Sequence, residues 1–313
     1  MNPNQKNVQK ICRKCFGGLL FLAVAFFGLV FTANAQRQME KLGRGLIVLR
    51  TSSTQTYIGW RLLGNDPSEV GFNLYRTANA GVPVKLNSLP LTNTTDYVDT
   101  PANLSSTAYT YSVLPVMNGV EVPDTFANPL GQSAYTLPVN ATVRQYFPVA
   151  LQPVPVPNGN TYKVKFCWVG DFDGDGEYDF VVDRYNPTIA TNQFLEAYKR
   201  DGTFLWRMDM GYNSVNQYNI EPGSSSISIG HGDNVTAFDL DGDGKAEVIV
   251  RTAKGVIFAD GSVVGGTDDR VQYLSILDGM TGLEKARATI PNPYLSDGQM
   301  NGHMGVQIGR AHV

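Results

Sequence analysis

Residues 171–182 read DFDGDGEYDFVV and residues 239–250 read DLDGDGKAEVIV, so one acidic pattern occurs twice in the chain. Each copy runs into a β-branched or aromatic segment, the residue types that favour strands. Two further apolar segments follow each copy around an Asp-Gly pair, at 194–198 and 204–206 in the first repeat and at 273–277 and 283–286 in the second. An acidic loop that leads into a small antiparallel sheet, repeated along the chain, is typical of propeller blades.

The repeated loop offers oxygen atoms at alternate positions, which is how a tight loop surrounds Ca2+. Three carboxylates within five residues also repel one another unless a cation offsets their charge. The predicted ligands are Asp171, Asp173, Asp175, the Glu177 carbonyl and Asp179 in the first loop, and Asp239, Asp241, Asp243, the Lys245 carbonyl and Glu247 in the second.

Two other interpretations of the loops are possible. An EF-hand needs a bidentate Glu at position 12 and flanking helices, but Val182 and Val250 hold that position and strand-forming residues surround it. A pair of acidic turns without an ion is the simpler alternative. We predict calcium loops at strand entrances and expect the ion to have a structural rather than a catalytic role.

Upstream of the loops, residues 37–140 contain short alternating segments separated by turns, a spacing typical of a β-sandwich. The expected strands cover 46–51, 56–62, 71–76, 96–98, 108–116 and 134–139. Trp60 and the Tyr109–Val113 segment resemble the core aromatics and tyrosine corner of a fibronectin type III module. A stretch with Pro148, Pro153, Pro155 and Pro157 then predicts a domain boundary near residue 140, with propeller blades over 141–313.

The N-terminus has the features of a secretory signal peptide. Four cations precede an apolar stretch over 16–32, and Ala33-Asn34-Ala35 fits a cleavage site, so we predict that residues 1–35 are removed. An uncleaved membrane anchor is the alternative. Cleavage would change the formal net charge from −3 to −7. Beyond residue 35 only Cys167 remains; in an apolar run, it is expected to be a small core residue.

Composition narrows the class of function. Lys and Arg number 25 against 28 acids, with no basic run outside the leader, so nucleic acid is not an expected partner. We expect a secreted protein, extracellular or periplasmic, that is monomeric and makes no membrane contact after cleavage.

Motifs along the mature chain together resemble the rhamnogalacturonan lyases of polysaccharide lyase family 11. They are Met39-Glu40, Arg44-Gly45-Leu46, Trp60 to Gly64 with Asp66-Pro67, Asn73 to Arg76, Asp96 to Thr100, Gly170 to Val182, Ala197 to Lys199, Asp201 to Thr203, Leu205 to Arg207 and Asp239 to Glu247. The resemblance implies a fibronectin-like sandwich followed by an eight-bladed propeller with several calcium ions. It also implies cleavage of the rhamnogalacturonan I backbone of pectin by calcium-assisted β-elimination.

The stretch after the boundary is too short for eight blades at roughly 40 to 50 residues each, so we expect an incomplete propeller in an incomplete reading frame. The catalytic base is then expected beyond residue 313, and the fragment is expected to be inactive.

Candidate substrate-groove residues within the chain are Asp183, Arg184 and Asn186 after the first loop, and Arg251 and Lys254 after the second; solvated blade edges are the alternative. His231 and His303 are expected to be structural. A noncatalytic, integrin-like calcium-binding propeller for glycan binding or adhesion remains the second functional hypothesis.

Overall fold

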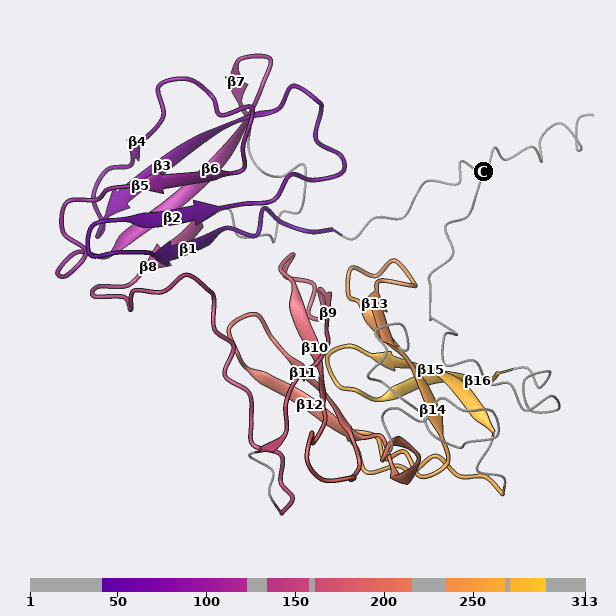
Figure 1. Ribbon diagram of the computed structural model, residues 1–313. Helices are drawn as coiled ribbons and strands as arrows, with labels where there is room; N and C mark the ends of the chain where they lie inside the picture. Colours follow the sequence, from indigo (N-terminus) through magenta and orange to yellow (C-terminus); the bar gives the residue numbers. More distant parts are fainter. Residues whose placement is uncertain (1–40, 123–133, 158–160, 216–234, 268–270, 291–313) are drawn as a thin grey trace, which may run out of the picture. The chain divides into compact units, whose positions relative to one another are not determined.

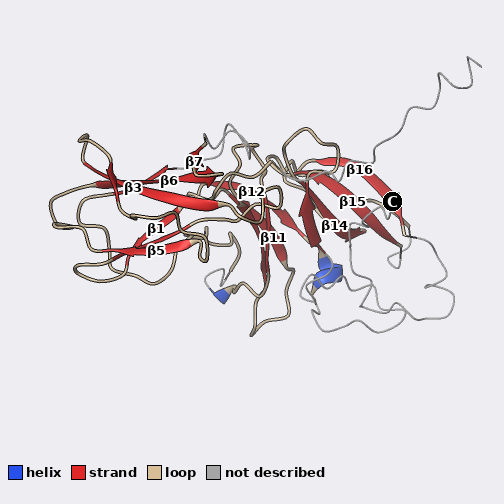
Figure 2. Cartoon of the chain, turned by 90° about the horizontal axis from the view of Figure 1, so that it is seen from above, coloured by secondary structure: helices blue, strands red, loops and turns tan. Residues whose placement is uncertain are grey.

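The computed structural model describes residues 41–122, 134–157, 161–215, 235–267 and 271–290. This part of the chain is all-β, with no α-helix and only short 3-10 segments such as η3 (Tyr212–Ser214) beside the strands (Figure 2). No helix within these described residues has the length and apolar character needed to cross a membrane. The predicted leader at 1–35 lies outside the described residues.

The N-terminal strands form two antiparallel sheets (Figure 1). One sheet has the order β1-β2-β5, and the other has the order β4-β3-β6-β7 with β8 paired to β6. The strands are β1 (Ile47–Arg50), β2 (Thr56–Gly59), β3 (Gly71–Ala78), β4 (Val84–Lys85), β5 (Asp96–Asp99), β6 (Tyr109–Met117), β7 (Val120–Glu121) and β8 (Ala134–Leu137).

The two sheets share one core, as expected for a sandwich. Successive side chains of a strand point to opposite faces, and buried positions alternate with less buried ones along β1, β2 and most of β6. The core brings together buried side chains from both sheets, including Ile58, Phe72 and Tyr111. Trp60 packs edge-on against Phe72 with ring centroids 5.5 Å apart. The aromatic residues that suggested a fibronectin-like module therefore serve as packing residues.

The C-terminal strands form two four-stranded antiparallel sheets, which we call blade 1 and blade 2 (Figure 1). Blade 1 has the order β12-β11-β10-β9 and blade 2 the order β13-β14-β15-β16. Their strands are β9 (Cys167–Gly170), β10 (Asp179–Arg184), β11 (Phe194–Tyr198), β12 (Phe204–Asp209), β13 (Val235–Phe238), β14 (Glu247–Ala253), β15 (Gln272–Asp278) and β16 (Glu284–Thr289).

The two blades are packed together through a continuous apolar core. Phe172, Val181 and Trp206 of blade 1 belong to the same cluster of buried residues as Val248 and Leu277 of blade 2. The Trp206 indole also donates a hydrogen bond to the Gly279 carbonyl (2.7 Å), so one blade is fixed to the other by a polar contact as well.

Gly279 is required where the blades meet. A Cβ atom at this position would lie 2.1 Å from the Ala246 carbonyl oxygen and 2.5 Å from the Phe172 ring. Such distances are far inside van der Waals contact, so no larger residue fits without movement of the backbone.

One prediction about packing is wrong. Cys167 is exposed rather than part of the core. It begins β9, an edge strand of blade 1 that pairs only with β10, and Val169 two residues later is also exposed. An apolar run on an edge strand buries less of its surface than the same run in the middle of a sheet.

Candidate metal centres

Both acidic loops join the first strand of a blade to the second. The first connects β9 to β10 and the second connects β13 to β14, so each loop lies at the entrance of a central strand. Gly174 and Gly176 have φ angles of 80° and 85°, and Gly242 and Gly244 repeat this with 80° and 93°. These left-handed conformations are readily adopted only by glycine, which explains the Asp-Gly-Asp-Gly pattern in both loops.

The first loop folds around the carboxylate of Asp171. The Gly174 amide donates to one of its oxygens (2.8 Å) and the Gly176 amide donates to the other (2.7 Å). The Phe172 amide closes the loop by donating to Asp179 (3.1 Å). The backbone therefore fixes the first and last carboxylates of the loop.

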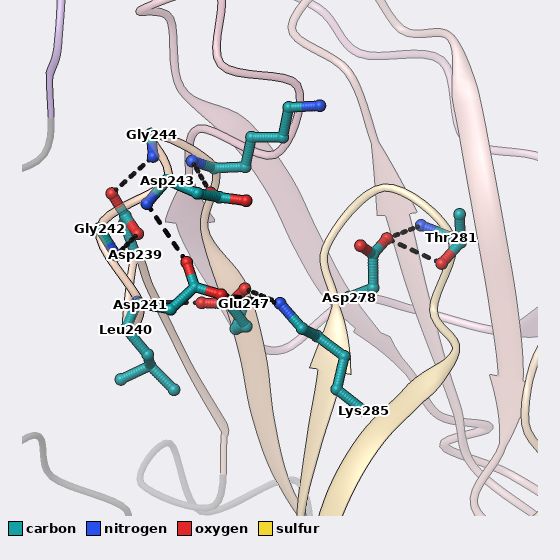
Figure 3. A network of polar contacts seen from close by, with 11 residues as sticks. Asp239, Leu240, Asp241, Gly242, Asp243, Gly244, Glu247, Asp278, Thr281 and Lys285 are labelled. Atoms are coloured by element: carbon teal, nitrogen blue, oxygen red, sulfur yellow. Dashed lines mark hydrogen bonds and ion pairs between the residues drawn. The ribbon is translucent and has the colours of Figure 1, made fainter.

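The second loop repeats these contacts one for one (Figure 3). Asp239 accepts hydrogen bonds from the amides of Gly242 (2.7 Å) and Gly244 (2.9 Å), and Glu247 accepts one from the Leu240 amide (2.9 Å). Glu247 thus replaces Asp179 with a side chain one methylene longer at the same position of the pattern.

Three carboxylates converge in each loop. Ligand atoms of Asp171, Asp173 and Asp179 lie within 4.8 Å of one another, and so do those of Asp239, Asp241 and Glu247. A set of carboxylate oxygens on a tight loop suits a hard divalent cation, which takes oxygen ligands at about 2.3–2.6 Å in the case of Ca2+. The residues present therefore fit the predicted ion.

The other predicted ligands lie outside these two clusters. One side-chain oxygen of Asp175 accepts a hydrogen bond from the Glu177 amide, and Asp243 does the same with the Lys245 amide, both at 2.8 Å. The predicted contributions of Glu177 and Lys245 were backbone carbonyls, and these remain predictions.

The Glu177 side chain instead forms ion pairs. Its Oε2 atom accepts hydrogen bonds from Arg61 (3.1 Å) and from Arg200. Arg61 also donates to the carbonyls of Gly43 (3.0 Å) and Gly176 (3.2 Å). The Glu177 carboxylate is therefore engaged by arginines, one of which comes from the segment that follows β2.

Burial makes the charged forms of the carboxylates in the first loop costly. Loss of hydration raises the pKa of Asp171 to about 6 and that of Asp179 to about 7, although backbone amides donate to both side chains. Desolvation disfavours the charged form of a carboxylate unless a positive charge compensates. A divalent cation at the three converging carboxylates would supply that compensation.

The second loop is more exposed, and a lysine side chain compensates part of its negative charge. Lys285 on β16 donates to Asp241 (3.1 Å) and to Glu247 (2.7 Å) (Figure 3). The hydrogen bond from Lys285 lowers the pKa of Asp241, and the two carboxylates raise the pKa of the lysine. In the first loop, Lys199 pairs with Asp173 alone among the three clustered carboxylates.

The two loops also touch each other. The Ala246 amide donates a hydrogen bond to the Asp171 carbonyl (2.6 Å). A Cβ atom at Gly174 would lie 3.3 Å from the Gly244 carbonyl oxygen, so the two glycine turns are close neighbours. The loops therefore form one acidic edge across both blades.

The groove candidates of blade 1 are buried. Asp183 is fully buried and accepts hydrogen bonds from the amides of Lys165 (2.7 Å) and Phe166 (2.8 Å). Arg184 is buried and paired with Glu196 (2.6 Å). Asn186 is buried too, and its side chain accepts hydrogen bonds from the turn that follows it. The solvated edge is therefore wrong for these three residues, and their contact with substrate stays a prediction.

The groove candidates of blade 2 differ from each other in burial. Arg251 is buried within β14 and donates to Gln272 across the sheet (3.3 Å). Lys254 is half-buried just after the same strand. Near residues 251 and 254, apolar and charged residues do not alternate clearly. The sequence alone therefore does not show which charged side chains there are buried. His231 and His303 lie outside the described residues.

The sequence patterns missed Lys199, Arg200 and Lys285 as neighbours of the loops. Lys199 and Arg200 directly follow β11, and Lys285 lies on β16. They reach the acidic residues across strand pairs, a relation that spacing within a loop does not reveal. Their positive charge near expected strand ends was the only available signal.

Comparison with known families gives two matches in sequence order. A family model described as "Rhamnogalacturonan I lyases beta-sheet domain" matches residues 37–128. A second, described as "Rhamnogalacturonan lyase family 11, C-terminal domain", matches residues 152–287. The two matches cover the sandwich strands up to β7 and the two blades almost completely.

Individual proteins give the same result. The chain is 34% identical over 276 residues to rhamnogalacturonan endolyase YesW of Bacillus subtilis (strain 168), and 31% identical over 275 residues to the exolyase YesX of that strain. These alignments cover 82% and 79% of the chain but only 40% and 39% of the two relatives. The chain therefore spans about two fifths of their length.

Solved structures agree with the sequence comparisons. The rhamnogalacturonan lyase PL11 of Bacillus licheniformis matches with a TM-score of 0.60 and 30% identity, over 85% of the chain and 45% of that structure. The YesW crystal structure matches with a TM-score of 0.59 and 31% identity, over 84% of the chain and 44% of that structure.

Proposed function

Because the chain belongs to polysaccharide lyase family 11, the rhamnogalacturonan lyases, we propose that it is part of a secreted enzyme that cleaves the rhamnogalacturonan I backbone of pectin by calcium-assisted β-elimination. The observation that carries the proposal is the 34% identity to an endolyase across both the sandwich and the blades. The chain covers 40% of that relative, so the activity is proposed for the whole protein that contains it.

The two acidic loops would hold the calcium ions of this enzyme. The ligand carboxylates are Asp171, Asp173 and Asp179 in blade 1 and Asp239, Asp241 and Glu247 in blade 2. A bound Ca2+ supplies positive charge that offsets the repulsion among these groups. The backbone amides of each loop hold the first and last carboxylates in place, so the chain presents its ligands before the ion arrives.

The chemistry expected of the whole enzyme is removal of a proton next to a carboxylate. Neutralising the galacturonate carboxylate makes the C5 proton more acidic, a base takes that proton, and the rhamnose oxygen at C4 leaves as the double bond forms. We assign no described residue as the base. The role of the described part in this reaction is to bind cations and to fix the first blades.

We also propose that the protein is exported. A cleaved leader would deliver the protein to the compartment where pectic polysaccharide is found. The test is N-terminal sequencing of the exported protein. A start at Gln36 supports cleavage after Ala35, and a start at Met1 in a membrane fraction supports an uncleaved anchor.

The activity is tested by incubating the protein that carries this chain with rhamnogalacturonan I. The expected product has a 4,5-unsaturated uronate at its new non-reducing end, detected by ultraviolet absorbance and mass spectrometry. The sizes of the early products distinguish endo from exo attack. Products that lack the double bond, or glycan binding without any cleavage, would contradict the proposal, and the latter would favour a noncatalytic propeller.

A further inference from the structure

Lys285 links two of the three clustered carboxylates of the second loop (Figure 3). Its amino group lies 3.1 Å from Asp241 Oδ2 and 2.7 Å from Glu247 Oε1. The three residues come from the loop itself, the first position of β14 and the outer strand β16. A single flexible cation thus lies on oxygens that a metal ion would use.

The position of Lys285 follows from an irregularity in the β15–β16 pair. Ile276 pairs with Ala286 and Leu277 pairs with Glu284, so Lys285 is the extra residue where the register shifts. A bulge of this kind re-aims a side chain. Blade 1 has the same shift between β11 and β12, where Leu205 is the extra residue, so the equivalent position there carries no charge.

The last carboxylate of each loop shows the consequence. In blade 1 both oxygens of Asp179 accept hydrogen bonds from backbone amides, those of Phe172 (3.1 Å) and Arg200 (2.9 Å). In blade 2 one oxygen of Glu247 accepts the Leu240 amide (2.9 Å), but the other accepts the Lys285 amino group. A side-chain cation in the second loop therefore replaces a backbone donor in the first.

We propose that Lys285 is a built-in competitor of the divalent cation at the second loop, which holds Asp241 and Glu247 in the metal-free protein and lowers the affinity of that loop for the ion. An ammonium group has only donors and cannot act as a ligand, and its charge repels a divalent ion placed on the same oxygens. Metal binding must release the lysine first. The inference rests on the proposed cation binding but not on lyase activity.

The test is calorimetric titration of Ca2+ into the chelator-treated, dialysed full chain. Asp239→Asn identifies the binding event that belongs to the second loop. Lys285→Met removes the ammonium and keeps the length of the side chain. Loss of the two ion pairs of Lys285, one to the exposed Asp241 and one to the buried Glu247, predicts roughly fivefold tighter binding in that event, with the other event unchanged.

Arg287→Met is the matched control. Arg287 lies on the same strand and pairs with Glu284 (2.9 Å), and it makes no ion pair with the loop in the described part of the chain. The control variant loses the same charge, so it measures the general electrostatic effect and is expected to shift affinity by less than twofold.

A second measurement, thermal unfolding, shows whether Lys285 competes with Ca2+ or only stabilises the fold. Chelated Lys285→Met is expected to melt below the wild-type chain, and the difference is expected to disappear at saturating Ca2+. Equal or weaker Ca2+ affinity in Lys285→Met, a gain no larger than that of Arg287→Met, or no Ca2+ binding at the second loop would each overturn the proposal. These experiments use no polysaccharide, so their failure is distinct from failure to detect a lyase.

Discussion

Replacement of Glu196 by Ala is expected to destabilise blade 1 severely. Glu196 lies on β11 and is fully buried. Its carboxylate accepts hydrogen bonds from Arg184 Nη1, Arg207 Nε and the Tyr198 hydroxyl, each at 2.6 Å. The substitution would therefore leave two guanidinium groups without their anion.

The magnitude follows from the burial of the partners. Breaking a buried ion pair by removing one member costs about 3–5 kcal/mol. Arg184 is 6% exposed but Arg207 is 17% exposed, so water can recover part of the loss for the second arginine. The lower end of the range, about 3 kcal/mol, is the expected cost. The same arginines donate to the Gln152 and Pro153 carbonyls, so the linker is expected to loosen with the blade.

The assay is equilibrium unfolding in urea, followed by tryptophan fluorescence and far-ultraviolet circular dichroism. Glu196→Gln keeps the shape and one acceptor oxygen, so it is expected to fall between the wild-type chain and Glu196→Ala. Glu69→Ala serves as the control because Glu69 is exposed and bonded only to its neighbour Ser68 among the described contacts. A loss below about 1 kcal/mol for Glu196→Ala, or a loss equal to that of the control, would refute the reasoning.

Three other perturbations have defined outcomes. Gly279→Ala is expected to lower the melting temperature strongly, because its Cβ would lie 2.1 Å from the Ala246 carbonyl oxygen, whereas Gly265→Ala adds a methyl group to open space and is expected to be nearly neutral in the same scan. Burial raises the pKa of Asp183, so the wild-type chain loses stability as pH rises from the ordinary aspartate pKa through the raised one. Asp183→Asn does not titrate, and its free energy of unfolding relative to the wild type should therefore increase over that window in urea titrations; a difference independent of pH would exclude this origin. Calcium at a hundredfold excess over its dissociation constant should add about 2.7 kcal/mol per occupied loop, and identical melting curves with calcium and with chelator would count against both loops.

Much of the fold could be predicted because local sequence and final environment agree. The strand expected at 194–198 is β11 as observed. The expected 96–98 segment stops one residue short of β5, and the expected 273–277 segment is one residue shorter than β15 at each end. Alternation and turn residues suffice where one face of a strand is buried. The strands β4 and β7 were not predicted, since two residues carry no periodicity, and the four-residue strands β9 and β13 were missed as well.

The site was less accessible from the sequence. The acidic loops at 171–179 and 239–247 could be predicted from local sequence, because the alternate carboxylates and the two glycines of each loop lie within one short segment. Asp183 and Arg184 could not be placed in the same way. Arg184 pairs with Glu196, twelve residues away along the chain, and Asp183 accepts hydrogen bonds from the amides of Lys165 and Phe166, which are 18 and 17 residues away. Lys285 likewise reaches the second loop only because of a register shift between two later strands.

The most direct test of the account is an anomalous difference map from crystals of this protein grown with a lanthanide in place of calcium. The account predicts one strong peak among the clustered carboxylates of each loop, at residues 171–179 and at residues 239–247. Well-ordered loops without a peak at either position would contradict the claim that these blades are built around bound cations.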